Sequence, residues 1–417
     1  MKKYLLTLLA ISIMVSSCCD CNKNGIQQVR PETVGLDSKH LALADKVFDD
    51  AIAEKSIPGA VFAVVKDGKL VYLKAYGNKS IVPTVEPMTT NTVFDLASVS
   101  KCVGTTLSIM QLVEDGKIRI TDKVSMYIPN FKDWVDPETG KTQAITISDL
   151  MSHSSGVLPY INTKTYLEKY GPNTPDSLIK HIATELPLLY RPTTNYRYSC
   201  LNFITLQNIL QNVTGEKLCD YAAENVFGAL GLKHTTYLPI EKNLREKSLA
   251  RVAPDFMSLV APTEVVDGKV LLGEVHDPTA RLVNMGNSGN AGVFSNAEDL
   301  AVIAAAIMNG GEFNGKRILS PLTVEKMITV PKQNAPHIER SLGWDNYTTG
   351  AGTKGDIFLN QPRSFVHTGY TGTSMMIDMD TKCAVIILTH RVHPADKNSV
   401  ARLRALATNI VAGSFIK

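Results

Sequence analysis

The patterns that predict β-strands lie near the two ends of this 417-residue chain, and the long middle has few of them. The β-rich runs are 61–65, 70–75, 373–379 and 383–389. Asp67-Gly68 separates the first two runs and predicts a tight hairpin. Residues from about 121 to 270 have the pattern of loops and short helices. Strands from both ends of one chain predict a shared antiparallel sheet flanked by helices plus a mainly helical lobe, an α+β fold.

The chain has no Pro/Ser-rich linker between hydrophobic blocks and no internal repeat, so we expect one unit over 31–417. Its sheet lobe is expected at about 31–120 and 281–417, and its helical lobe at about 121–280. A cleft between the two lobes is the expected place for a site.

The first residues have the pattern of an export signal. Lys2 and Lys3 precede an apolar run, 5–15, that is too short to span a bilayer. Ser16 and Ser17 then precede Cys18, which resembles a bacterial lipobox. This predicts a signal peptide at 1–17, lipidation of Cys18, a tether at 18–30 and a lipoprotein of the cell envelope. A plain secretory signal and an uncleaved anchor stay open as alternatives.

Composition argues against several classes of function. The net charge of +3 is spread without clusters of Lys and Arg, which disfavours nucleic acid as a partner. Beyond the N-terminal cysteines, the remaining four show no zinc-ligand spacing, and we expect buried free thiols rather than disulfides. His390 and His393 lack a third ligand in a recognisable motif. No metal and no cofactor is therefore predicted.

The tetrapeptide Ser98-Val99-Ser100-Lys101 places a hydroxyl and an amine one helical turn apart. It follows an extended segment, 92–96, and begins a helical pattern that runs to Asp115-Gly116. Orphan backbone N–H groups at a helix start would face whatever the serine attacks. The pattern predicts a nucleophile, its base and part of an oxyanion hole.

The same spacing recurs at Ser177–Lys180 and Ser414–Lys417, so it is weak on its own. Residues 174–176 open an ordinary amphipathic helix around the first of these copies, and the second is the end of the chain. Neither has a partner motif. For Ser98 itself, the alternative is a capping residue with a solvated Lys101.

Two later stretches supply partners for Ser98. Residues 196–203 begin a helical pattern and contain Tyr198 two residues before Cys200. Residues 365–373 lead into a strand and contain His367-Thr368-Gly369. An aromatic hydroxyl and a Thr-Gly strand follow the serine in the order that a serine acyl-enzyme site of this kind needs.

With these elements, the chain resembles the serine β-lactamase and penicillin-recognising superfamily. It is most similar to the branch with class C β-lactamases, D-alanyl-D-alanine carboxypeptidases and β-lactamase-like esterases. The resemblance runs from about Pro31 to the end. Its landmarks, in order, are Pro58-Gly59-Ala60, 94–101, 150–156, 291–295 and Leu342-Gly343-Trp344.

The resemblance implies a role for each matching residue. Ser98 would be the nucleophile, and Lys101 either a neutral base with a depressed pKa or an electrostatic partner. Tyr198 would act as base in acylation and activate water in deacylation. The backbone N–H groups of Ser98 and Tyr370 would form the oxyanion hole.

The residues His367, Thr368 and Gly369 match the K-T-G strand of the superfamily with His in place of Lys, and they would hold the substrate. The H-T-G variant is known among DD-peptidases of the superfamily, which disfavours a β-lactamase. Because histidine titrates near neutrality, we expect activity to change around pH ~6.5.

Two departures limit what the resemblance implies. Cys200 stands where the superfamily has an asparagine that holds the substrate amide, and a thiol is a poor hydrogen-bond partner. Asn202 would substitute if the helix has already begun at Tyr198. Nothing resembles the glutamate that deacylates class A enzymes, so fast β-lactam turnover is not expected.

The expected function is a serine hydrolase that forms a Ser98 acyl-enzyme, D-alanyl-D-alanine carboxypeptidase-like on peptidoglycan-type peptides. The alternatives are a carboxylesterase or weak β-lactamase and, from another class, a penicillin or muropeptide sensor without turnover. An α/β-hydrolase is disfavoured because no G-x-S-x-G elbow is present.

Overall fold

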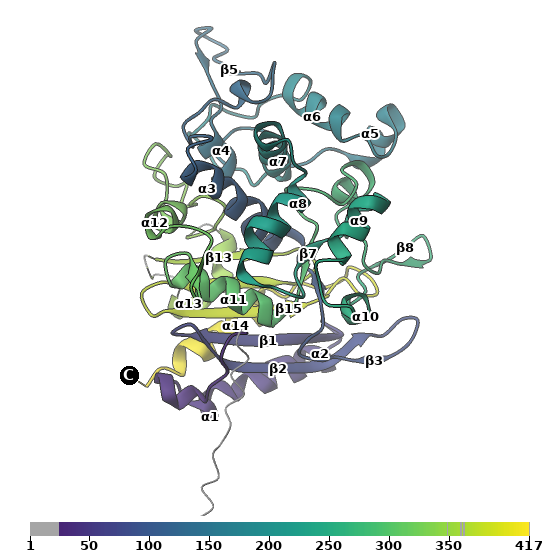
Figure 1. Ribbon diagram of the computed structural model, residues 1–417, viewed down its shortest axis with the longest axis vertical. Helices are drawn as coiled ribbons and strands as arrows, with labels where there is room; N and C mark the ends of the chain where they lie inside the picture. The colour runs from purple at the N-terminus through teal and green to yellow at the C-terminus, as the bar shows by residue number, and fades with distance from the viewer. Residues whose placement is uncertain (1–24, 348, 359–360, 362, 417) are drawn as a thin grey trace, which may run out of the picture.

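A six-stranded antiparallel sheet joins the two ends of the chain (Figure 1). The computed structural model describes residues 25–347, 349–358, 361 and 363–416. The strand order is β13-β14-β15-β1-β2-β3. The strands are β1 (Gly59–Lys66), β2 (Lys69–Ser80), β3 (Glu86–Pro87), β13 (Ser364–Thr368), β14 (Ser374–Asp378) and β15 (Cys383–Thr389). The predicted sheet shared by N- and C-terminal segments is confirmed by the pairing of β1 with β15.

The first hairpin forms as its sequence predicts. Asp67 and Gly68 both have positive φ, 52° and 71°, as a tight two-residue turn requires. Strand β1 is buried on both faces, so its alternate side chains enter two different cores. Phe62 points to one core, where its ring centroid lies 5.2 Å from that of Phe48. Val61 and Ala63 point to the other.

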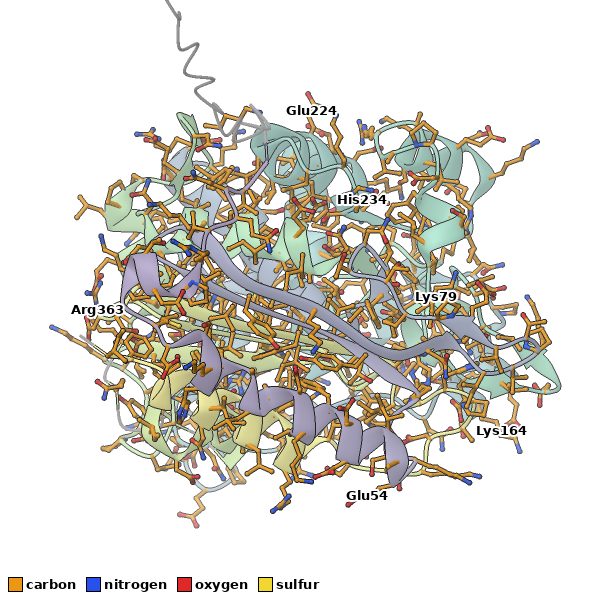
Figure 2. The ribbon with its side chains drawn as sticks, turned by 90° about the horizontal axis from the view of Figure 1, so that it is seen from below. Glu54, Lys79, Lys164, Glu224, His234 and Arg363 are labelled. Atoms are coloured by element: carbon orange, nitrogen blue, oxygen red, sulfur yellow. The ribbon has the colours of Figure 1, made fainter. Side chains whose placement is uncertain are left out.

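Helices cover both faces of the sheet. Helices α2 (Leu43–Ala53) and α14 (Ala401–Gly413) pack together on one face. Figure 2, which is seen from below, shows α2 in purple to one side of the strands β1 and β2. In that view Glu54 marks the end of α2 and Lys79 lies on β2. On the other face, α11 (Ala297–Met308) packs against β1 and β15. This arrangement confirms the α+β class with its flanked antiparallel sheet.

The helical part of the chain lies beyond α11, above the sheet in Figure 1. Its helices are α3 (Leu107–Glu114), α4 (Ile147–Met151), α5 (Thr163–Tyr170), α6 (Pro175–Thr184), α7 (Cys200–Thr214), α8 (Leu218–Ala222), α9 (Lys242–Leu249) and α10 (Phe256–Leu259). Strand β4 (Phe94–Asp95) lies directly before Ser98 in the chain and pairs with β10 (Val293–Ser295), which pairs in turn with β7 (Thr236–Tyr237) in a small sheet. It fixes the segment that carries the serine.

The helix expected from Ser98 to Gly116 is not one α-helix. A 3₁₀ turn over Ala97–Val99 is followed by a π-helical stretch over Lys101–Thr106, and only then by α3. π-helical turns often occur at functional sites because the wider turn changes where side chains point. The predicted end is confirmed: Asp115 caps the helix and Gly116 has a φ of 69°.

The expected signal peptide, Cys18 and most of the expected tether lie outside the described residues. The end of the tether prediction is wrong, because residues 27–29 pair with β2. Val29 N–H donates to Leu70 O at 3.0 Å, and Leu70 N–H donates to Gln27 O at 2.9 Å. Ile26 is buried in the core. Over the described ranges, no helix is both long and apolar enough to cross a membrane.

Candidate active site

Ser98 lies on a strained turn that a buried carboxylate holds in place. The preceding Ala97 has a φ of 45°, which is unfavourable for a residue with a Cβ. Asp95 Oδ1 accepts the Ala97 N–H at 2.8 Å, and its Oδ2 accepts the His276 N–H at 2.7 Å. Backbone strain of this kind persists only where the surroundings enforce it. The turn presents a half-buried Ser98 to a cleft.

The Lys101 side chain is completely buried and reaches Ser98. Its Nζ donates to Ser98 Oγ at 3.0 Å and to Asn290 O at 2.8 Å. Burial lowers the pKa of Lys101, but the ionisable groups of Cys200 and Tyr198 beside it outweigh burial and raise it to about 12. This direction is opposite to the one a neutral base needs. It fits the other predicted role, a positively charged electrostatic partner.

Tyr198 lies directly before the N-cap of α7, with its ring against Lys101. Lys101 Nζ is 5.0 Å from the ring centroid, and no described residue makes a hydrogen bond with the Tyr198 hydroxyl. Burial raises the pKa of Tyr198, and the neighbouring ammonium opposes that rise. The buried hydroxyl is therefore free to exchange a proton with a group in the cleft.

His153 supports Tyr198 from behind. Its Nδ1 accepts the Ser199 N–H at 3.1 Å, so its proton lies on Nε2, and its ring centroid is 4.4 Å from that of Tyr198. Ser199 in turn caps α7 by accepting the Asn202 N–H. The landmark segment 150–156 thus positions the tyrosine.

His367 is buried at the edge of the cleft, 3 % exposed. Its Nδ1 donates to Thr368 O at 3.0 Å, which leaves Nε2 as an acceptor without a partner among the described residues. Burial, with the cations Arg340 and Lys101 nearby, lowers the pKa of His367 well below its usual value. This direction argues against the expected His367-dependent change of activity near pH ~6.5.

Cys200 and Asn202 do not replace the missing asparagine. Cys200 Sγ lies 3.5 Å from Lys101 Nζ. The prediction that Asn202 would hold the substrate is wrong, because α7 begins only at Cys200 and Asn202 does not share a helix face with Tyr198. Asn202 is fully buried, and its Oδ1 accepts the Ser155 hydroxyl at 2.8 Å.

The segment before Ser98 and the loop of Tyr370 are joined by two threonine hydroxyls. Thr371 Oγ1 donates to Asp95 O at 2.8 Å, and Thr373 Oγ1 donates to Leu96 O at 2.9 Å. A Cβ on Gly369 would lie 2.4 Å from Leu96 O, so only glycine allows this approach. The two N–H groups expected in the oxyanion hole are carried by segments held together in this way.

The cleft that Ser98 opens into has a volume of about 690 Å³. Tyr198, His367, Thr368, Gly369 and Tyr370 line it together with Ser98, so these predicted site residues share one cavity. Lys101 reaches it through Ser98, whereas Cys200 and Asn202 are not among its lining residues.

Arg340 and Arg404 line the cleft but are absent from the predicted site. Arg340 is 3 % exposed, and its Nη1 donates to Asp345 Oδ2 at 3.1 Å and to Tyr196 Oη at 3.2 Å. Its Nε and Nη2 are buried and have no partner among the described residues. Arg404 comes from α14. A sequence signal existed for each: Arg340 precedes the Leu342-Gly343-Trp344 landmark, and Arg404 falls on the buried face of an apolar helix.

Comparison with known proteins decides the family. Residues 44–409 match the β-lactamase family. The chain belongs to the β-lactamase family. Its members are serine hydrolases of the β-lactamase and penicillin-binding-protein type, as Ser98 and Lys101 suggest.

Relatives in the β-lactamase family carry different names. The chain is 31% identical over 382 residues to the "N-acetylmuramyl-L-alanine amidase" of Bacillus subtilis (strain 168), covering 88% of this chain and 84% of that protein. It is 29% identical over 401 residues to the "Putative D-alanyl-D-alanine carboxypeptidase" of Escherichia coli (strain K12), covering 93% and 90%. The solved structure of EstCE1, a hydrolase with promiscuous acyltransferase activity, has the same fold, with a TM-score of 0.68, 23% identity and coverage of 89% and 98%.

Proposed function

We propose that the protein hydrolyses an amide bond in peptidoglycan-derived peptides through a Ser98 acyl-enzyme, as a D-alanyl-D-alanine carboxypeptidase-like enzyme. The carrying observation is the Lys101 Nζ to Ser98 Oγ distance of 3.0 Å in a cleft lined by Arg340, whose Nε and Nη2 have no hydrogen-bond partner among the described residues. The first contact supports nucleophilic catalysis. The second supports a substrate with a carboxylate.

In acylation, Ser98 Oγ attacks the substrate carbonyl and its proton passes to Tyr198 in the phenolate form. Lys101 keeps its own proton and favours that phenolate by its charge. The developing oxyanion accepts hydrogen bonds from the backbone N–H groups of Ser98 and Tyr370. Tyr198 then returns the proton to the leaving amine. In deacylation, Tyr198 takes a proton from the water that attacks the acyl carbonyl. It returns that proton to Ser98 Oγ as the ester bond breaks, which releases the carboxylic acid product and regenerates the phenolate.

The charge of the cleft supports an anionic substrate. Arg340, Arg391, Lys397 and Arg404 line it, against the carboxylates of Asp345 and Asp396. The guanidinium of Arg340 offers two adjacent N–H groups in the geometry that a carboxylate accepts. Leaving such buried donors unsatisfied costs about 1–3 kcal/mol each, and a bound carboxylate would recover that cost.

An amidase that cuts between a muramyl group and L-alanine is the second candidate, supported by the 31% identity to the Bacillus subtilis relative. Both candidates cut an amide of a carboxylate-bearing peptidoglycan fragment. Both place the protein in the cell envelope, in agreement with the names of the relatives and with the predicted export signal.

The test offers four substrates to the full-length protein: a D-alanyl-D-alanine peptide, a muramyl-L-alanine peptide, a fluorescent penicillin and a short-chain p-nitrophenyl ester. We expect wild type and the matched control Ser177→Ala to release product from one of the peptides, and Ser98→Ala to lose it. Peptide turnover that survives Ser98→Ala would overturn the proposal. Ester turnover alone would identify an esterase, and stable penicillin labelling without turnover would identify a sensor.

A further inference from the structure

Arg404 is a buried arginine of α14 that contacts the loop carrying Tyr370. Its side chain is 7 % exposed and lies among the apolar residues of α14, which face the sheet. Nη2 donates to Gly369 O at 3.0 Å and to Thr373 O at 2.8 Å. One guanidinium nitrogen therefore holds both ends of the loop 369–373.

The Gly369 carbonyl and the Tyr370 N–H belong to the same peptide unit. Because a peptide unit is planar and trans, a bond that fixes the carbonyl also fixes the direction of the N–H on the opposite side. That N–H is the second donor expected in the oxyanion hole. A hydrogen bond to the carbonyl also polarises the amide and strengthens its N–H as a donor.

The Gly369-Tyr370 peptide unit gains a constraint from outside its own turn. Gly369 lacks a Cβ, so its backbone has wide freedom to rotate the following peptide plane. The Gly369 N–H donates to Thr373 O at 2.7 Å, and the Gly369 carbonyl accepts the Gly372 N–H at 3.1 Å within the turn. Arg404 adds a second, charge-assisted bond to that carbonyl from outside the loop.

We propose that Arg404 is a positioning residue of the oxyanion hole, which orients and polarises the Gly369-Tyr370 peptide so that the Tyr370 N–H points at the reacting carbonyl. The inference rests on the proposed function, because the hole acts only if Ser98 attacks a carbonyl. Burial, with Arg391 nearby, lowers the pKa of Arg404 to about 9, so the guanidinium remains charged at neutral pH.

The test compares Arg404→Met and Arg404→Lys with wild type, using a p-nitrophenyl ester and phenylboronic acid. A boronic acid forms a tetrahedral adduct with the serine, and one of its oxygens occupies the oxyanion position. Arg402→Met is the matched control on α14, where Arg402 is exposed and does not line the cleft. Arg245→Met is the control for a partly buried arginine-to-carbonyl contact, because Arg245 Nη2 donates to Gly273 O at 3.0 Å away from the cleft.

We expect kcat of Arg404→Met to fall about 10²-fold, the loss typical for one oxyanion donor, with KM within about threefold of wild type. The affinity for phenylboronic acid should fall by a similar factor, and Arg404→Lys should regain part of both. Both controls should keep wild-type values. If Arg404→Met does not fold, Arg404→Lys is compared with wild type instead. A lower kcat with an almost unchanged KM would then support the inference.

A kcat and boronate affinity within twofold of wild type in a folded Arg404 variant would overturn the inference alone. So would a loss seen equally in Arg245→Met. Wild-type turnover and boronate binding that do not depend on Ser98 would overturn the proposed function and this inference with it.

Discussion

The Sγ of Cys200 lies 3.5 Å from the Nζ of Lys101, so a thiol faces the ammonium that contacts the nucleophile. Burial raises the pKa of Cys200, and the charge of Lys101 opposes that rise. A neutral thiol at this distance gives Lys101 a weak partner. The position that the superfamily fills with a substrate-holding amide thus offers little to a substrate.

Replacement of Cys200 by asparagine should favour amide substrates. The carboxamide adds one good hydrogen bond, and about 1.4 kcal/mol of added transition-state binding is tenfold in rate. We expect Cys200→Asn to raise kcat/KM for the peptide about tenfold relative to the p-nitrophenyl ester. Cys200→Ala should leave the ratio unchanged. An equal effect of Cys200→Asn on peptide and ester would contradict this account.

Loss of Arg340 should weaken binding of the substrate carboxylate. A charge-assisted pair is worth about 1.5–3 kcal/mol, so KM of Arg340→Met for a peptide with a free carboxylate should rise about 10- to 100-fold. The amidated peptide should show no such rise. Steady-state kinetics with the two peptides measures the difference.

The control for Arg340 is the double variant Arg340→Met with Asp345→Asn, which removes the carboxylate that faces the guanidinium at 3.1 Å. If the single variant only damages the fold, the double variant regains stability and substrate affinity together. If Arg340 binds the carboxylate, affinity stays low. The same KM for free and amidated peptides in wild type would rule out the assigned role.

Short sequence motifs predicted the first hairpin and the residues of the cleft that belong to those motifs. The Asp67-Gly68 turn gives the first hairpin, and the motifs at Ser98, Tyr198 and His367 bring their own residues into one cleft. The roles of Arg340 and Arg404 depend on contacts with Asp345 and Gly369 that no spacing in the chain encodes.

The pKa of His367 could not be predicted from the sequence either, because it depends on contacts made only in the folded structure. A histidine before Thr-Gly titrates near neutrality only if it is exposed. Burial beside Arg340 and Lys101 instead lowers the pKa of His367 well below its usual value. The position of Asn202 likewise depended on where α7 begins, and the N-cap at Ser199 places that start two residues after Tyr198, at Cys200.

His367 should not contribute a titration to activity between pH 6 and pH 8. Its pKa lies well below the ordinary value, so the imidazole is neutral across this range. Activity should instead rise with pH as the phenolate form of Tyr198 grows, because burial raises the pKa of that hydroxyl. Profiles of kcat/KM against pH for wild type and His367→Gln should have the same shape. An inflection near pH ~6.5 present in wild type and absent in the variant would show that His367 titrates there.

His390 should make the fold less stable in acid. Burial and His393 lower the pKa of His390 to about 3, whereas an unfolded histidine titrates near ~6.5. Above that value neither state binds the proton. Below it only the unfolded state does, so stability falls by about 1.4 kcal/mol per pH unit until the folded pKa is reached.

The comparison for His390 is urea denaturation of wild type and His390→Gln at pH 7.5, 6.5 and 5.5. The stability advantage of wild type should shrink by about 1 kcal/mol between pH 6.5 and 5.5, because the full slope is reached only below the unfolded pKa. Asp149, whose pKa burial raises to about 6, acts in the opposite direction in both proteins and cancels in the difference. A difference that stays constant with pH would mean that His390 is protonated in the folded state.

Replacement of Ala97 by glycine should stabilise the fold and test the strain beside Ser98. The φ of 45° at Ala97 costs an alanine about 1 kcal/mol that a glycine does not incur. We expect Ala97→Gly to raise the free energy of unfolding by about 1 kcal/mol, less the extra entropy of the unfolded glycine. Ala51→Gly, in the helix α2, should lower the free energy of unfolding by about 1 kcal/mol and is the matched control.

Since the Asp95 carboxylate still holds the N–H of residue 97, acylation of Ser98 by a fluorescent penicillin should keep its rate in Ala97→Gly. Equal destabilisation by both substitutions would show that the turn before Ser98 is not strained.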